Sequence, residues 1–291
     1  MYKIDGHNHP DFLNMSFSDM LADMKKNGIS KTCLATWENP WIENYPSNMT
    51  ICPSPLSGNV PVPFERVLAY YEKAPDKFIM GYAPDPRKFD AVYKMKSAVD
   101  TYGVKMCSEV KFRMMYDNPD AVDLFRFCGD CGVPVTLHFD NPGASLADPG
   151  MLWKHYWYGG DILTLERLLE LCPKTNFLAH APGFWNALSN SDEWKTVSYP
   201  SGPVIPGGHI ERLLGKFNNL YLDCSAGSGC GALKRDPEYT IKLMLRHPDR
   251  FVYARDGFTS ELSEYVDTLN LPEDVRKLFY HGNILRLIGE V

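Results

Sequence analysis

Residues 119–138, PDAVDLFRFCGDCGVPVTLH, contain the repeating unit that decides the fold. Four apolar side chains in residues 119–131 recur at helical spacing: Ala121, Leu124, Phe125 and Cys128. This spacing predicts an amphipathic helix with one buried face. The apolar run at residues 133–139 follows and predicts a short buried strand, with His138 near its end. A helix joined to a buried strand is the unit of a parallel α/β fold.

The same alternation runs through the whole chain. Strands are expected at residues 5–9, 31–37, 78–83, 103–111, 133–139, 176–180, 220–224 and 251–255. Helices are expected at residues 16–26, 64–73, 90–102, 119–131, 163–172, 208–214 and 239–246, with two short helices closing the chain. Eight such units in 291 residues predict an α/β protein, a (β/α)8 TIM barrel forming one domain over residues 1–291. The alternative, an open doubly wound sheet, expects a glycine-rich phosphate turn after the first strand, and the sequence has none there.

Three connections that follow predicted strands are long, at residues 38–63, 140–160 and 181–207. They are rich in Pro, Gly, Trp and Asn. In a (β/α)8 barrel, loops after the strands form the C-terminal face, where barrel enzymes place their active sites. The sequence therefore predicts a site at that face.

Composition limits the partners of this chain. The net charge is −6, and no run of five or more basic residues occurs, so we expect no binding to nucleic acid or to an anionic membrane. We expect no signal peptide, because the first residues lack an apolar segment, and no membrane span, because no stretch approaches 18 consecutive apolar residues. The eight cysteines lie in apolar segments and indicate reduced thiols, although Cys128 and Cys131 have the spacing of a redox or zinc pair. We expect a cytoplasmic protein with a small-molecule substrate, and a homo-oligomer is compatible with this composition.

Residues 5–9 read Asp-Gly-His-Asn-His. Side chains two residues apart on a strand point to the same face, so Asp5, His7 and His9 would share a face. Neutral imidazole is the commonest metal ligand in proteins and suits zinc, iron, nickel or copper. Taken alone, the pair fits equally well a polar strand whose histidines face water.

Further polar residues stand at the ends of other apolar strands. They are His138, His180 and Asp256, with Glu109 and Lys111 at the end of the fourth strand. Because parallel strands of a barrel end on one rim, these groups are expected to converge there with the two N-terminal histidines. Such convergence favours a functional metal site over isolated structural polar groups.

At this point the sequence resembles the amidohydrolase superfamily, and most closely its amidohydrolase-2 branch of metal-dependent barrel hydrolases and decarboxylases. The resemblance rests on seven stretches: residues 5–9, Glu109-Val-Lys111, residues 137–140, residues 179–185, residues 223–228, Arg255-Asp256 and residues 280–286. The resemblance implies a divalent metal, Zn²⁺ first and Mn²⁺ second, held by His7, His9, Glu109, His138 and Asp256. Glu109 and Lys111 compete for the position on the fourth strand, so one or two ions are expected.

The residue types suggest the chemistry. A metal lowers the pKa of bound water to about 7. Asp256 is the expected proton shuttle, and His180 the group that polarises a substrate carbonyl or stabilises an oxyanion. Trp37, Lys111, Asp140 and Trp185 are the expected substrate-binding residues.

The first functional expectation is hydrolysis of a small ester, lactone or amide. The alternative is a non-hydrolytic decarboxylase of a carboxylated ring, which Arg255 beside Asp256 would suit. Arg255 also has the opposite parity to Asp256, so it fits equally well a structural ion pair on the outer face. A barrel that only binds a ligand is the remaining reading.

Overall fold

The fold is built around eight parallel strands. The structure is a computed structural model that describes residues 1–44, 48–52, 59–140 and 157–290. Its strands are β1 (Lys3–Asn8), β2 (Ile29–Leu34), β3 (Phe78–Met80), β4 (Cys107–Val110), β5 (Val135–His138), β6 (Phe177–His180), β7 (Leu220–Asp223) and β8 (Phe251–Val252). They pair in chain order as β1-β2-β3 and as β4 to β8, and every pairing is parallel.

Backbone hydrogen bonds join the two sheets at both seams and close the barrel. At the first seam, Tyr82 N–H donates to the Met106 carbonyl oxygen at 3.0 Å. At the second seam, Gly6 N–H donates to the carbonyl oxygen of Tyr253, also at 3.0 Å. A side chain at Gly6 would place its Cβ 2.9 Å from Cγ1 of Val252, so this seam requires glycine. The predicted TIM barrel is confirmed.

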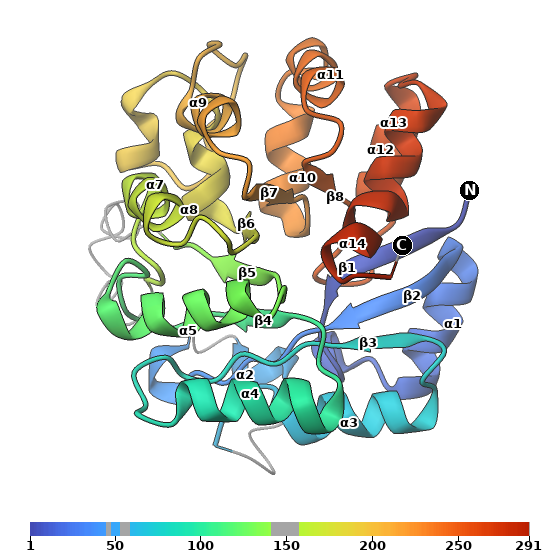
Figure 1. Ribbon diagram of the computed structural model, residues 1–291. Helices are drawn as coiled ribbons and strands as arrows, with labels where there is room; N and C mark the ends of the chain where they lie inside the picture. Colours follow the sequence, from blue (N-terminus) through green and yellow to red (C-terminus); the bar gives the residue numbers. More distant parts are fainter. Residues whose placement is uncertain (45–47, 53–58, 141–156, 291) are drawn as a thin grey trace.

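Helices surround the strands in chain order (Figure 1). The larger ones are α1 (Phe17–Asn27), α3 (Phe64–Lys73), α4 (Ala91–Tyr102), α5 (Pro119–Asp130), α7 (Ile162–Leu171), α9 (His209–Lys216), α10 (Ala226–Lys234), α11 (Pro237–Arg246) and α12 (Glu261–Thr268). Short helices are α2 (Asn48–Ile51), α8 (Pro182–Trp185), α13 (Glu273–Lys277) and α14 (Asn283–Leu287). The larger helices face the sheet with apolar side chains, which form the main core between strands and helices.

Helix α1 shows how local sequence sets these boundaries. The Ser16 side chain accepts from the Asp19 N–H, while the Asp19 carboxylate accepts from the Ser16 N–H, which is a capping box. Gly28 ends the helix with φ of 67°, a left-handed conformation that glycine adopts without strain. The chain then enters β2 directly.

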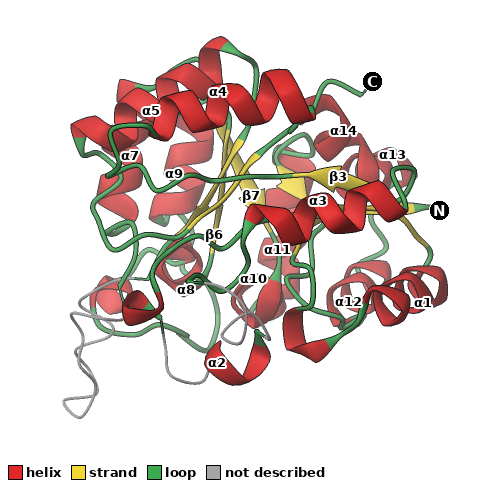
Figure 2. Cartoon of the chain, turned by 90° about the horizontal axis from the view of Figure 1, so that it is seen from below, coloured by secondary structure: helices red, strands yellow, loops and turns green. Residues whose placement is uncertain are grey.

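The two ends of the barrel differ in polarity. A buried apolar cluster fills the interior at the N-terminal end, and Ile284 and Leu287 of α14 pack against it. Figure 2 shows α14 and the pair α2 and α8 toward opposite ends of the strands. Because α14 closes the N-terminal end, the polar strand ends at the other face are left to form a site.

Several expected boundaries differ from the structure. All strands except β6 end earlier than expected. Helix α10 lies where no helix was expected, because its three glycines, Gly227, Gly229 and Gly231, are poor helix formers. Most of the expected connection at residues 140–160 lies outside the described residues. In the described part of the chain, no helix is both long and apolar enough to cross a membrane.

Candidate metal centre

Seven ionisable side chains from six strands meet at the C-terminal end of the barrel. They are His7 and His9 from β1 and its end, Glu109 from β4, His138 from β5, His180 from β6, Asp223 from β7, and Asp256 after β8. The first six are buried, and the Asp256 side chain is 18% exposed. Burying so many ionisable groups is costly unless they are hydrogen-bonded, paired with opposite charges or bound to a metal ion.

The His7 ring is held by one carboxylate and presents its other nitrogen to the centre. Its Nδ1 lies 2.8 Å from Oδ2 of Asp223, and its Nε2 has no hydrogen-bond partner among the described residues. Burial opposes protonation, but the neighbouring Asp223 carboxylate outweighs it and raises the pKa of His7 to about 10. A carboxylate on one ring nitrogen is the arrangement that orients a metal-ligating histidine.

The His9 ring is fixed by the backbone. Its Nδ1 lies 2.9 Å from the carbonyl oxygen of Ala35, which can only accept a hydrogen bond, so Nδ1 carries the hydrogen and Nε2 carries the lone pair. Burial and the positive charge of His7 lower the pKa of His9 to about 4. His9 is therefore neutral at pH 7, with its lone pair directed toward Asp256 and Glu109, 3.6 and 3.7 Å away.

Glu109 connects the two halves of the centre. Its Oε1 lies 2.7 Å from Nδ1 of His138 and 2.6 Å from Nε2 of His180, while its Oε2 faces His9. Burial opposes ionisation, but the charges of His138 and Lys111 hold the pKa of Glu109 well below its usual range. Glu109 is thus an anion that can bridge two metal positions or close one of them.

Three groups of donors among the described residues have the spacing to hold an ion, and the donor atoms within each group lie within 4.8 Å of one another. They are His7, His9 and Asp256; His7, His180 and Asp223; and Glu109, His138 and His180. Imidazole nitrogens mixed with carboxylate oxygens suit a divalent transition metal. Without an ion, the Nε2 proton of His7 has no acceptor among the described residues; a bound ion would replace that proton and take the lone pair. The donor set therefore fits the expected divalent metal, and His180 belongs with the donors.

Asp256 and Asp140 stand at the mouth of the centre. Asp256 has φ of 46°, a left-handed conformation that aspartate adopts more readily than most residues, and its N–H donates to the carbonyl oxygen of His7 at 2.8 Å. Asp140 Oδ2 lies 3.0 Å from Nε2 of His138 and so orients that ring. Both carboxylates line a cavity of about 310 Å³ above the donors, together with Lys111, His138 and His180.

The structure separates the two tryptophans expected to bind substrate. Trp37 lies under Lys111, whose Nζ is 3.9 Å from the centre of its ring, and next to His9. Trp185 does not line the cavity above the donors. Its indole N–H donates to the carbonyl oxygen of Asp223 at 3.1 Å, and it lines a neighbouring cavity instead. The short helix α8 turns it there, so a substrate contact of Trp185 would lie in the neighbouring cavity and not above the donors.

Two further residues depart from expectation. Asp223 was not predicted, although it ends an apolar strand just as His138 and His180 do. Asp5 does not share the face of His7, because the pairing of β1 with β2 shifts between Asp5 and Asn8. Its carboxylate binds Nε of Arg255 at 2.8 Å, and Arg255 also pairs with Asp23 of α1 at 2.7 Å. Of the two readings of Arg255, the structural ion pair is confirmed.

The amidohydrolase family model matches residues 60–289. This chain belongs to the amidohydrolase family. The match begins after His7 and His9. The structure, and not the family match, places these two histidines beside the donors in the matched residues. A search of curated proteins returned no match to this amidohydrolase.

Solved structures with the same fold include decarboxylases. This amidohydrolase is similar to an uncharacterised TIM-barrel protein, Bb4693, from Bordetella bronchiseptica, with 17% identity, a TM-score of 0.65, and 100% and 99% of the two chains covered. It is similar to a 2,6-dihydroxybenzoate decarboxylase complexed with 2,6-dihydroxybenzoate, at 16% identity and a TM-score of 0.67, with 99% of each chain covered. A third is a dihydroxybenzoic acid decarboxylase from Polaromonas sp. JS666 with bound manganese and the inhibitor 2-nitroresorcinol, at 17% identity and a TM-score of 0.61, with 99% and 97% covered.

Proposed function

We propose that this amidohydrolase-family protein is a metal-dependent, non-oxidative decarboxylase of a hydroxylated aromatic carboxylate. The observation that carries the proposal is the Lys111 ammonium group, which is buried beside the donor cluster with no carboxylate of the described residues within 4.0 Å. The decarboxylases among the similar structures support the same choice.

Lys111 is 8% exposed and lines the cavity above the donors. Its Nζ lies over the rings of Trp37 and Tyr158, 3.9 and 5.4 Å from their centres. Among the described residues, no carboxylate lies within 4.0 Å of it. A buried cation is costly unless an anion accompanies it, so this cavity favours an anionic ligand. The surrounding rings favour an aromatic one.

The chain's own groups suit the reaction. A divalent metal on the His, Glu and Asp donors would supply positive charge for the carboxylate and adjacent hydroxyl of the substrate. Asp256, at the mouth of the cavity, is placed to deliver a proton to the ring. The bond between ring carbon and carboxylate breaks, its electron pair stays on the ring carbon, that carbon takes the proton, and CO2 leaves. No oxidant or attacking water is needed.

Hydrolysis of a small ester, lactone or amide is the second candidate. It is favoured by Asp256 Oδ1 lying 3.6 Å from Nε2 of His9, where a carboxylate could take a proton from a bound water. A neutral ester, however, supplies no anion for the Lys111 ammonium group. The decarboxylase proposal accounts for Lys111 and the hydrolase proposal does not.

The two proposals are separated with purified protein loaded with Mn²⁺ or Zn²⁺. The protein is incubated in D2O with 2,6-dihydroxybenzoate and 5-carboxyvanillate, and in parallel in H2¹⁸O with a panel of esters and lactones. We expect CO2 release and one deuterium at the vacated ring carbon. Release of ¹⁸O-labelled acids from the second panel, with no CO2 from the first, would establish hydrolysis instead.

A further inference from the structure

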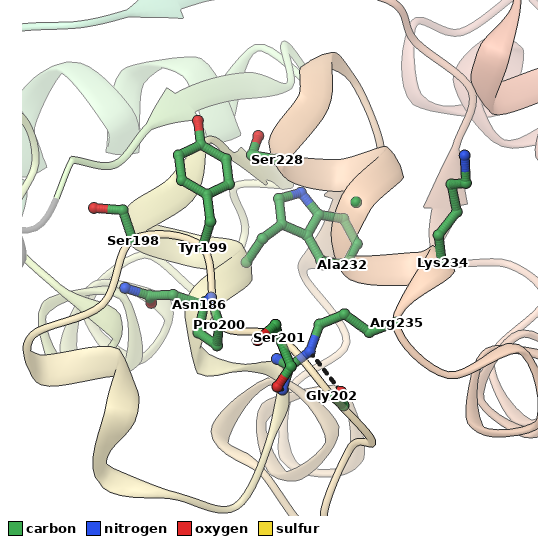
Figure 3. Close-up of a pocket in the computed structure, with 12 residues that line it drawn as sticks. Asn186, Ser198, Tyr199, Pro200, Ser201, Gly202, Ser228, Ala232, Lys234 and Arg235 are labelled. Carbon is green, nitrogen blue, oxygen red and sulfur yellow. Dashed lines mark hydrogen bonds between the residues drawn. The ribbon is translucent and has the colours of Figure 1, made fainter.

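A second cavity of about 360 Å³ lies beside the cavity above the metal donors. The loop after β6 and helix α10 enclose it (Figure 3). Its walls include Trp185, Tyr199, Pro200 and Ala232, which give it apolar surfaces. Figure 3 draws Tyr199 and Ser228 toward one end, and Arg235 with Gly202 toward the other.

The two cavities adjoin. Ser198, Tyr199 and Ser228 line both of them. A molecule whose reacting end lies at the donors can therefore extend past these three residues into the second cavity.

The second cavity also holds polar atoms that lack partners among the described residues. Ser228 is 4% exposed and its Oγ is unpaired. Asn186 is 2% exposed; its Nδ2 donates to the carbonyl oxygens of Trp194 and Val197, at 3.0 and 3.1 Å, which leaves Oδ1 unpaired. Buried polar atoms are almost always hydrogen-bonded, so these atoms point to a ligand with polar groups.

Arg235 supplies the charge in this cavity. Its Nε donates to the carbonyl oxygen of Gly202 at 3.1 Å and its Nη2 to that of Ser201 at 3.3 Å, while Nη1 has no partner. In the described residues no carboxylate lies within 4.0 Å of this guanidinium, whereas the adjacent Lys234 pairs with Glu261 at 2.7 Å. A guanidinium held by two neutral carbonyls, with donors left over, is suited to bind a carboxylate.

We propose that the second cavity is a substrate subsite that binds a remote carboxylate, joined to the reacting ring by an apolar chain. Arg235 binds that carboxylate, and Trp185 and Tyr199 contact the chain. The substrate would then be a dianionic aromatic acid, with one carboxylate at Lys111 and one at Arg235. The choice of which end of the substrate reacts rests on the proposed decarboxylase function. Binding of a carboxylate at the subsite does not depend on that function.

The test measures binding rather than turnover. The probes are salicylates that carry ω-carboxyalkyl chains of one to four methylenes, and the methyl esters of those chain carboxylates. Dissociation constants are measured by titration calorimetry on Mn²⁺-loaded protein. We expect at least one chain length to bind about tenfold or more tightly than its ester, because a charge-assisted hydrogen bond is lost in the ester.

Substitutions test which residues make the acid bind more tightly than its ester. Arg235→Met should abolish the difference between acid and ester, and Ala232→Phe should abolish it by filling the cavity. Arg167→Met, in α7 and paired with Asp117 at 2.6 Å, is the matched control and should keep it. If Arg235→Met fails to fold, Ala232→Phe decides alone. An acid–ester difference that is absent at every chain length, or that survives both substitutions, would overturn the subsite.

Different results would refute the subsite and the proposed decarboxylase function. Decarboxylation of unsubstituted salicylates without any chain-dependent gain would refute the subsite and leave the proposed function standing. Arg235-dependent binding without CO2 release from any probe would support the subsite and refute the decarboxylase.

Discussion

The Nδ1 atom of His7 lies 2.8 Å from Oδ2 of Asp223, and this contact turns the unpaired Nε2 of His7 toward the other donors. The two residues are 216 positions apart in the chain and meet because β7 and β1 end on the same rim. The contact makes Asp223 the group that orients a metal ligand.

We therefore predict that Asp223→Ala lowers Mn²⁺ affinity about 10- to 100-fold, the usual effect of losing such an orienting carboxylate. Asp223→Asn keeps an oxygen that accepts from Nδ1 and should fall between Ala and wild type. The measurement is titration of metal-free protein with Mn²⁺. Unchanged affinity in Asp223→Ala would show that this contact does not position His7.

Lys111→Met should raise KM for 2,6-dihydroxybenzoate about 10- to 100-fold with a much smaller effect on kcat. The reason is that the ammonium binds the anionic substrate in its ground state and transition state alike. Lys105→Met is the control, because Lys105 is exposed and precedes the same strand at the other end of the barrel. Equal KM values in wild type and Lys111→Met would remove the main support for an anionic substrate.

Asp256→Asn should lower kcat by about a hundredfold or more, the usual contribution of a group that transfers a proton. The fold should persist, since asparagine is isosteric and tolerates the positive φ of this position. Circular dichroism and steady-state kinetics on the same preparation check both statements. A fully active variant would show that the proton comes from another group.

Much of this centre could be predicted from sequence, for a specific reason. His138, His180 and Asp256 each follow an apolar run, and the fold forces such positions onto one rim. Asp223 likewise follows an apolar run, Leu220–Leu222, so its position on this rim could also have been predicted from the sequence. The cavity that Trp185 lines could not be predicted, because its position depends on α8, a single turn inside a long connection. Asp5 was misassigned because a register shift cannot be seen in a five-residue pattern.

Stability should depend on the pH through Glu38, outside the metal centre. Burial raises the pKa of Glu38 to about 7, although the Phe64 N–H donates to its carboxylate at 3.0 Å. The folded state thus binds this proton more tightly than the unfolded state, whose pKa is about 4.3. Its contribution is fully present below about pH 4.3 and is lost as the pH rises through 7.

Glu38→Gln keeps an acceptor for the Phe64 N–H and removes the titration. Its free energy of unfolding, relative to wild type, should rise by about 3 kcal/mol between pH 4 and pH 8. Urea unfolding of both proteins at the two pH values gives this difference, in which the titration of all other groups cancels. A relative stability independent of pH would mean that Glu38 titrates normally in the folded protein.

The most direct test of the account is the metal content of the protein. Elemental analysis of wild type should give one or two equivalents of a divalent ion, manganese or zinc. His7→Ala/His9→Ala should lose most of it, because His7 belongs to two of the three donor groups and His9 to one of them. The double control His209→Ala/His247→Ala removes two histidines outside these donor groups and should keep the wild-type content. Equal metal content in wild type and His7→Ala/His9→Ala would contradict the metal centre and the function proposed for it.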